Sequence, residues 1–133
     1  MSLLETIAVD GTVLAYIARA RELPSQTTFL TPKDCNLQVG HVVYRAGGEI
    51  TRHMHVPVER HLSTTTEVLV VEKGRCLVDV FDEARQLVRT CELTVGDIVI
   101  AVAGGHGFRL LEDTVLLEVK QGPYPGVAEK ERF

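Results

Sequence analysis

The sequence contains no apolar run that approaches the roughly 18 residues needed to cross a membrane as a helix. Basic residues are not in excess either, because 14 lysines and arginines face 18 aspartates and glutamates, for a formal net charge of -4. A negative field does not attract a phosphate backbone, so nucleic acid is not an expected partner. The N-terminal residues also lack the basic stretch of a secretory signal. We therefore expect a cytoplasmic protein without membrane or nucleic-acid partners.

Cysteine is scarce, and its three members are Cys35, Cys76 and Cys91. Their number is odd and no two of them have the C-x-x-C spacing, which argues against a disulfide framework and against a thiolate zinc site. The simplest interpretation is that all three are small, buried hydrophobic side chains. Cys76 and Cys91 flank a predicted hairpin, so a disulfide across that hairpin stays open as an alternative.

Low-complexity and linker-like segments are absent, and 133 residues suit one compact domain. From about residue 36 onward, short apolar runs alternate with turn residues at intervals of roughly ten residues. Val and Leu dominate these runs, which are LQVGHVVY, EVLVVEKG, CLVDVF, QLVRTCEL, DIVIAVA and TVLLEVKQ. Such residues favour pleated strands packed on both sides of a small core, so the pattern predicts an all-β sandwich or barrel.

The N-terminal stretch LLETIAVDGTVLAYIARARE is compatible with a helix or with strands, and its Asp10-Gly11 pair favours a hairpin. We divide the single domain into extension strands at residues 1–35, a barrel core at 36–124 and a polar tail at 125–133. The sheet edges of a small barrel need covering, so a homodimer is the expected state. The segment ARARELPSQTTFL is a candidate for a strand exchanged between subunits.

Three of the five histidines lie within nine consecutive positions, at His53, His55 and His61. Side chains alternate across a strand, so His53 and His55 point to the same side, a spacing that suits two ligands of one metal ion. His106 is a candidate for a third ligand, because the glycines around it let the backbone bend closely around a site. The alternative is that the H-x-H pair belongs to an exposed strand with no ligand.

Two stretches of the chain resemble the conserved motifs of the cupin superfamily. Gly47-x5-His53-x-His55 and, further on, Glu67-x6-Gly74 resemble the halves of its first motif, G-x5-H-x-H-x3 or x4-E-x6-G.

The second motif, G-x5-P-x-G-x2-H-x3-N, is similar to Gly96-x7-Gly104 followed by His106. Here Val102 stands in place of the proline, His106 comes one residue early and Leu110 occupies the asparagine position. A shift of one residue turns a side chain to the opposite face unless a bulge absorbs it. Gly104-Gly105 offers a place for such a bulge.

Over residues 36–124 the chain is similar to the small single-domain cupins, which implies a double-stranded β-helix, or jelly-roll, barrel. The resemblance also implies that one divalent transition metal, Fe, Mn, Ni, Cu, Co or Zn, is bound inside the barrel. Carried over position by position, the metal ligands would be His53, His55, Glu67 and His106.

The carboxylate ligand has two candidates. Residues 56–66 separate His55 from Glu67, whereas the family has three or four residues at this place. Glu59 has the family's distance from the histidines but lacks the glycine that should follow. We favour Glu67, because it opens a predicted strand that would hold it rigidly inside the barrel.

If Glu67 is the ligand, the inserted segment becomes a lip over the site. Glu59, Arg60 and His61 would then contact the substrate or transfer protons as catalytic residues, and a solvated charged loop is the alternative. His41 is interpreted as a strand histidine with a hydrogen-bond partner. Arg109 either contacts an anionic substrate or lies on the outer surface.

Three imidazoles and one carboxylate leave coordination positions open for water, O2 or a chelating substrate. The expected function is therefore that of a metal-binding cupin acting on a small, oxygen-rich metabolite, as an oxygenase or as an isomerase or epimerase. One alternative is a non-catalytic module that binds a metal or small ligand. Another is a metal-free isomerase with a histidine as general base.

Overall fold

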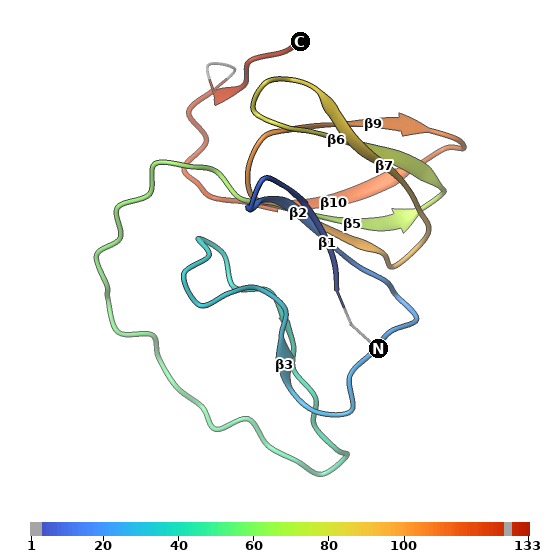
Figure 1. Ribbon diagram of the computed structural model, residues 1–133. Helices are drawn as coiled ribbons and strands as arrows, with labels where there is room; N and C mark the ends of the chain where they lie inside the picture. Colours follow the sequence, from blue (N-terminus) through green and yellow to red (C-terminus); the bar gives the residue numbers. More distant parts are fainter. Residues whose placement is uncertain (1–3, 127–128) are drawn as a thin grey trace.

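The computed structural model describes residues 4–126 and 129–133, in which β-strands make up the regular structure and no α-helix occurs (Figure 1). The strands are β1 (Glu5–Val9), β2 (Thr12–Ala18), β3 (Thr28–Phe29), β4 (Gly40–His41), β5 (Glu67–Lys73), β6 (Cys76–Phe81), β7 (Leu87–Leu93), β8 (Ile98–Ala101), β9 (Gly105–Leu110) and β10 (Val115–Lys120). The predicted all-β class is confirmed. Among the described residues, no helix could span a membrane.

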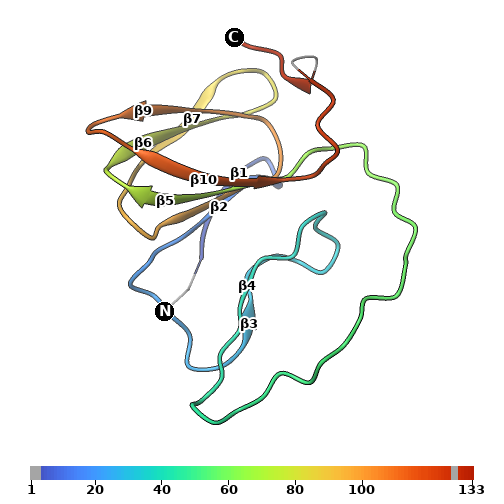
Figure 2. The same cartoon turned by 180° about the vertical axis from the view of Figure 1, so that it is seen from behind.

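Two antiparallel sheets face each other. The larger sheet has the strand order β1-β2-β8-β5-β10, and the smaller has the order β7-β6-β9. Viewed from either side, the sheets form two layers in the upper part of the molecule (Figures 1 and 2). Strands distant in sequence are neighbours in both sheets, which is typical of sandwich and jelly-roll architectures.

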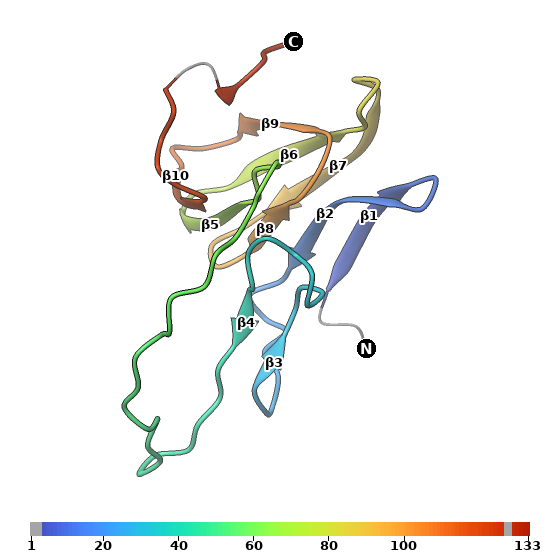
Figure 3. The same cartoon turned by 90° about the vertical axis from the view of Figure 1, so that its left-hand side faces the viewer.

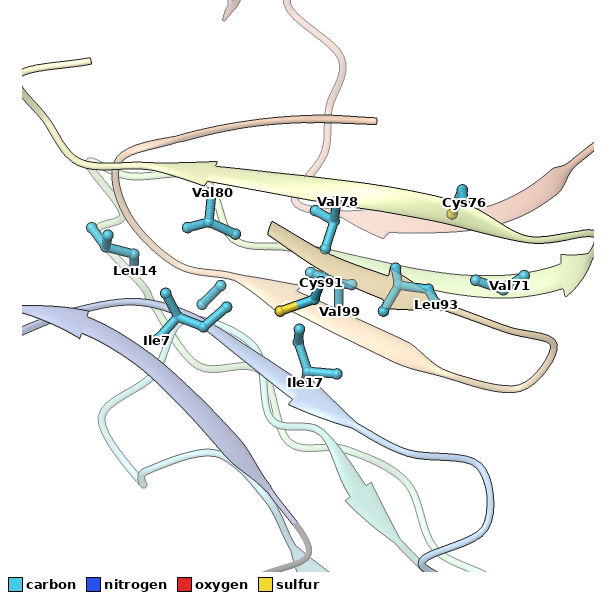
Figure 4. Close-up of a cluster of buried hydrophobic side chains, with 11 residues drawn as sticks. Ile7, Leu14, Ile17, Val71, Cys76, Val78, Val80, Cys91, Leu93 and Val99 are labelled. Atoms are coloured by element: carbon cyan, nitrogen blue, oxygen red, sulfur yellow. The ribbon is translucent and has the colours of Figure 1, made fainter. Parts of the chain in front are cut away.

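The core fills the space between the two layers (Figure 4). Side chains alternate between the two faces of a strand, so β6 contributes every second residue to the core, at Cys76, Val78 and Val80. The facing sheet contributes Ile17 and Val99, both without exposed surface. These side chains bring together strands from both ends of the chain, so the hydrophobic effect holds the two layers as one unit.

The hairpin turns follow the local sequence. Asp10 and Gly11 both have positive φ, 50° and 79°, and connect β1 to β2 as the sequence predicts.

Cys76 lies opposite Leu93 rather than Cys91, and all three cysteines are free. The interpretation of the cysteines as buried side chains is confirmed for Cys76 and Cys91 and is wrong for Cys35, which is half-buried, and no disulfide crosses the hairpin.

The sandwich is closed along one side and open along the other. On the closed side, Glu5 of β1 pairs with Arg89 of β7 at 3.2 Å between Oε1 and Nη2. On the open side, β9 and β10 each have a neighbour on one edge only, within the part of the chain that the structure describes. The closed barrel expected from the sequence is therefore not completed by these residues.

The segment that precedes β5 explains the opening. Of the predicted strand LQVGHVVY, only Gly40 and His41 form a strand, and they pair with Thr28 and Phe29 outside both main sheets. Every residue from 44 to 65 is exposed, and no strand lies among them. This segment, which we call the arm, runs in a wide arc away from the sandwich before it returns at β5 (Figures 1 and 3).

Candidate functional site

A pocket of about 820 Å³ lies between the sheets on their open side. Strands β5, β6, β9 and β10 form its walls, and the C-terminal residues cover one end. Its lining consists of Thr65, Glu67, Leu69, Asp79, Phe81, Ala101, Ala103, Gly104, Gly105, His106, Gly107, Phe108, Glu118 and residues 129–133. The volume suits a small-molecule ligand, and apolar walls with a few polar groups are typical of such sites.

Glu67 and His106 meet inside this pocket. Glu67 is the first residue of β5, which lies between β8 and β10 and is therefore held from both sides. Its carboxylate Oε2 is 2.8 Å from Nε2 of His106, which lies on β9 in the other sheet. The contact joins the two layers. Two of the four ligands predicted from the sequence are thus brought together by the fold.

The local backbone explains why both side chains face inward. Just before Glu67, the backbone N–H of Thr66 donates to Oε1 of Gln121 at 2.6 Å, which fixes the start of β5 against the end of β10. His106 lies opposite Val80, a core residue, so its side chain points to the inner face. The one-residue shift in the second motif therefore does not turn His106 away from the pocket.

A third titratable group, Glu118 of β10, hydrogen-bonds to Glu67. The hydrogen bond from His106 holds the pKa of Glu67 at about 2, against the opposing effect of burial. The hydrogen bond with Glu67, together with burial, raises the pKa of Glu118. Two neighbouring carboxyl groups thus have their pKa values pushed apart, a pattern that suits one acid and one base.

Sequence reasoning missed Glu118. The residue lies in the predicted strand TVLLEVKQ, where alternation places it on the same face as Leu116, a residue packed against the core. A carboxylate at an inward-facing position of a predicted strand was the feature of the sequence that could have identified Glu118 as a site residue. No motif marks it, because the two cupin-like motifs lie between Gly47 and Gly74 and between Gly96 and Leu110.

His53 and His55 lie on the arm, away from Glu67 and His106. Their ring centroids are 5.3 Å apart, so the predicted placement of the two imidazoles on one side of an extended segment is confirmed. Nδ1 of His53 is 2.8 Å from the carbonyl oxygen of Thr51. A carbonyl only accepts, so Nδ1 is the donor, and in the neutral imidazole Nε2 is then the nitrogen with a lone pair for a ligand bond.

The structure therefore contains two separate pairs rather than one centre. Across the described ranges, no group of three or more His, Cys, Asp or Glu side chains is arranged to hold a metal ion. One pair, Glu67 with His106, lines the pocket. The other pair, His53 with His55, is exposed on the arm.

The predicted lip does not line the pocket. Glu59, Arg60 and His61 are exposed on the arm, and the pocket walls do not include them. Their role as catalytic residues stays a prediction. Between the two candidate carboxylates, Glu67 is the one that contacts His106.

The structure also tests the interpretations of Arg109 and His41. Arg109 lies on the outer face and forms a bidentate pair with Asp79, at 2.7 Å for both contacts, as one of its two interpretations predicts. The interpretation of His41 as hydrogen-bonded is wrong at one atom, since its buried Nδ1 has no partner among the described residues.

The C-terminal residues form the end wall of the pocket. The ring of Phe133 packs edge-on against Phe81 with centroids 5.2 Å apart, and Arg85 lies over the Phe133 ring. Lys120 of β10 is 3.7 Å from Glu129. The predicted polar tail is therefore attached to the sandwich at the pocket.

No protein-family model, curated protein or solved structure matches the chain.

Proposed function

We propose that the protein binds one divalent transition metal and acts on a small, oxygen-rich metabolite, as an oxygenase or as an isomerase or epimerase. The observation that carries the proposal is the 2.8 Å contact between Glu67 and His106 inside the 820 Å³ pocket. An oxygen and a nitrogen donor, 39 positions apart in the sequence, converge there from two different sheets. Iron, manganese, nickel, copper, cobalt and zinc all accept such donors.

The residues present suit such a metal. Glu67 and His106 supply one oxygen and one nitrogen donor, and His53 and His55 carry two further imidazoles on one face of the arm. When bound, the metal would supply Lewis acidity or a site for O2. The chain's own residues would hold the substrate, with Leu69, Phe81 and Phe108 excluding water around its apolar part.

The fold that we propose for the complete site is the jelly roll of the small single-domain cupins. Two facing antiparallel sheets, with Glu67 and His106 on their inner faces, support this assignment. We also propose that the protein works in the cytoplasm, where free thiols such as Cys76 and Cys91 stay reduced.

The test is the metal content of protein purified without an affinity tag from cells supplied with the metals. We expect close to one metal ion per chain, and at least a tenfold lower content in Glu67→Gln, since the amide is a weaker ligand than the carboxylate. Glu59→Gln is the matched control on the arm and should keep the wild-type content.

A wild-type content below about one-tenth equivalent would reject the metal proposal. A loss confined to Glu59→Gln would show that the other carboxylate is the ligand.

The hydrogen bond between Glu67 and Glu118 favours a second candidate function, a metal-free isomerase. Glu118 would donate a proton, while Glu67, oriented by His106, would accept one. The two candidates separate by chelation: turnover of a sugar or hydroxy-acid substrate that survives complete metal removal, but is lost in Glu118→Gln, would favour the metal-free reaction. Binding without turnover would favour the non-catalytic module.

A further inference from the structure

The arm has the sequence of a strand but none of its contacts. Residues 44–65 contain no regular structure among the described residues, and connections longer than about 12–15 residues without it are uncommon in compact domains. Apolar side chains stand at alternate positions, at Ile50, Met54, Val56 and Val58, with Arg52 as the exception in this set. Polar side chains stand between them except at Pro57, which limits backbone pairing at that residue. An alternation of this kind is typical of a strand with one buried face.

The apolar face of the arm is unusually open to water. Met54 is 92% exposed and Val56 is 80% exposed. Full burial of a side chain of this size stabilises a protein by about 1.5–3 kcal/mol. An arm surrounded by solvent lacks this stabilisation for each of its apolar side chains. The arm therefore needs a surface to pack on.

The open side of the sandwich is a surface of the matching kind. Strands β9 and β10 end their sheets there, and within the described part of the chain no further strand pairs with their outer edges. On its outer face, opposite Glu118, β10 also exposes an apolar row at Val115, Leu117 and Val119, each about half exposed. A strand added beside β10 with its histidines toward the pocket would place its apolar side chains next to this row. The pocket with Glu67 and His106 lies between these two edges.

The arm and the rest of the chain carry net charges of opposite sign. The arm carries three arginines, two glutamates and three histidines: Arg45, Arg52, Arg60, Glu49, Glu59, His53, His55 and His61. Outside the arm the chain has 11 basic and 16 acidic residues, a formal net charge of -5. At the pocket itself, however, Asp79, Glu129 and Glu131 already pair with Arg109, Lys120 and Arg85. The attraction between the arm and another copy therefore comes from the net charges and is weak.

The arm projects away from its own sandwich. At its base, Asn36 Nδ2 donates to the carbonyl oxygen and to Oγ1 of Thr64, at 3.1 and 2.7 Å, and so fixes the returning end of the arm. From there the chain extends outward (Figure 3). An extended segment that goes out and returns over residues 44–65 reaches roughly 35 Å, about the width of a small domain. It is long enough to cross a neighbouring molecule.

We propose that the arm lies in the β9–β10 opening of a second copy of this chain, which returns the same contact. His53 and His55 of one copy then face Glu67 and His106 of the other, and each pocket is completed by two chains. The exchange of arms rests on the exposed apolar side chains of the arm and on the open edges of β9 and β10, with a small contribution from the net charges. The shared ligand set rests, in addition, on the proposed function.

A mixing experiment tests the shared site. One variant carries His53→Ala and His55→Ala, and the other carries Glu67→Gln and His106→Gln. Each alone should retain no metal. After equal amounts are unfolded together and refolded, about half of the dimers are mixed, and each mixed dimer has one intact site. The mixture should regain about a quarter of the wild-type metal content, whereas it should regain none if each arm served its own chain.

A measurement of mass tests the exchange without using the metal. Light scattering should give twice the 14.7 kDa of one chain. Val56→Asp should weaken dimerisation at least tenfold, since it places a charge in the buried face of the arm. Val95→Asp is the matched control, because Val95 is an exposed valine outside both surfaces and its replacement should leave the dimer intact.

The outcomes separate the two proposals. A monomer at all concentrations, or a dimer that Val56→Asp and Val95→Asp affect equally, overturns the exchange of arms. A dimer sensitive to Val56→Asp alone, without metal, supports the exchange and rejects the metal site. Metal in the wild type but none in the mixture overturns the shared site.

Discussion

Asp97 is a buried carboxylate at the turn between β7 and β8, and it is only 2% exposed. It accepts hydrogen bonds from the backbone N–H groups of Thr94 and Ala20, at 2.9 and 3.0 Å, and from Nη1 of Arg19 at 3.1 Å. Arg19 also pairs with Glu5 at 2.6 Å. One side chain thus ties the turn to the end of β2 and, through Arg19, to β1.

The pKa of Asp97 reflects this environment. Burial raises it, but the hydrogen bonds from Thr94, Ala20 and Arg19 together outweigh burial and hold the pKa below its usual value. A carboxyl group whose pKa is depressed by folding stabilises the folded state above its unfolded pKa of about 3.9. That contribution is lost as the pH falls through the folded pKa.

We expect Asp97→Asn to lower the free energy of unfolding by about 2 kcal/mol at pH 7, because the amide cannot provide a charged acceptor for Arg19 and the turn. The difference from the wild type should shrink as the pH is lowered, since the wild-type carboxylate is then protonated. Urea unfolding at pH 7 and at the lowest pH at which both proteins stay folded measures this. Asp113→Asn, at an exposed aspartate, is the control and should change little at either pH. A difference independent of pH would contradict the role of the charge.

At the scale of elements, alternation of apolar residues predicts most of the strands but not their partners. The runs that became β5, β6, β7, β8 and β10 all form strands: β6 buries every second residue, whereas the central strands β5 and β8 bury consecutive residues because both of their faces are covered. The run LQVGHVVY has the same alternation, yet only two of its residues pair. Local sequence shows which residues can form a strand, whereas pairing depends on an edge supplied by distant or separate chain segments.

Strand β9 was not predicted from the sequence, because its glycines leave no recognisable apolar alternation. Gly105 and Gly107 interrupt the apolar pattern, and glycine weakens a strand by itself. Pairing with β6 supplies the stability that the local sequence lacks. The glycines around His106 and its place in the second cupin-like motif explain why His106 could be identified as a site residue although its strand could not.

For the candidate site, as for the strands, the sequence predicts local features but not how distant segments are placed. The contact of Glu67 with His106 and the closeness of His53 to His55 both follow from residues chosen in the sequence. The distance between the two pairs does not, since it depends on where the arm packs. Glu118 was missed because an acidic residue in a strand without a motif is usually a solvated one.

Gly104 controls the connection that brings His106 into the pocket. Its φ is +67°, and a Cβ at this position would collide with the carbonyl oxygen of Phe81 and approach Leu14 at 3.0 Å. We expect Gly104→Ala to lower the free energy of unfolding by about 2 kcal/mol or more, from backbone strain and overpacking together.

Gly107→Ala is the matched control, because nothing lies within 4 Å of a Cβ there and its φ is not positive. Thermal unfolding of both variants measures the difference. Equal melting temperatures would show that the turn after β8 tolerates a side chain and does not constrain β9.

At the scale of the whole molecule, stability depends on how much of the apolar surface is buried and how much stays exposed to water. The core between the sheets is well buried, at Ile17, Val78 and Val99 among others. The arm and the β10 row remain exposed, so a single chain leaves part of its apolar surface in water. A second copy that covers both would link folding to association.

Linked folding and association make the melting temperature depend on protein concentration. For a dimer of this chain length, the enthalpy of unfolding is on the order of 190 kcal/mol, which corresponds to a rise of about 2–3 °C for each tenfold increase in concentration. We expect the wild type and Val95→Asp to show this slope in calorimetry over a hundredfold range. Val56→Asp, with a weakened dimer, should show a smaller slope and a lower melting temperature. A wild-type melting temperature that stays constant over that range would mean that the chain folds alone and that its open edge is stable without a partner.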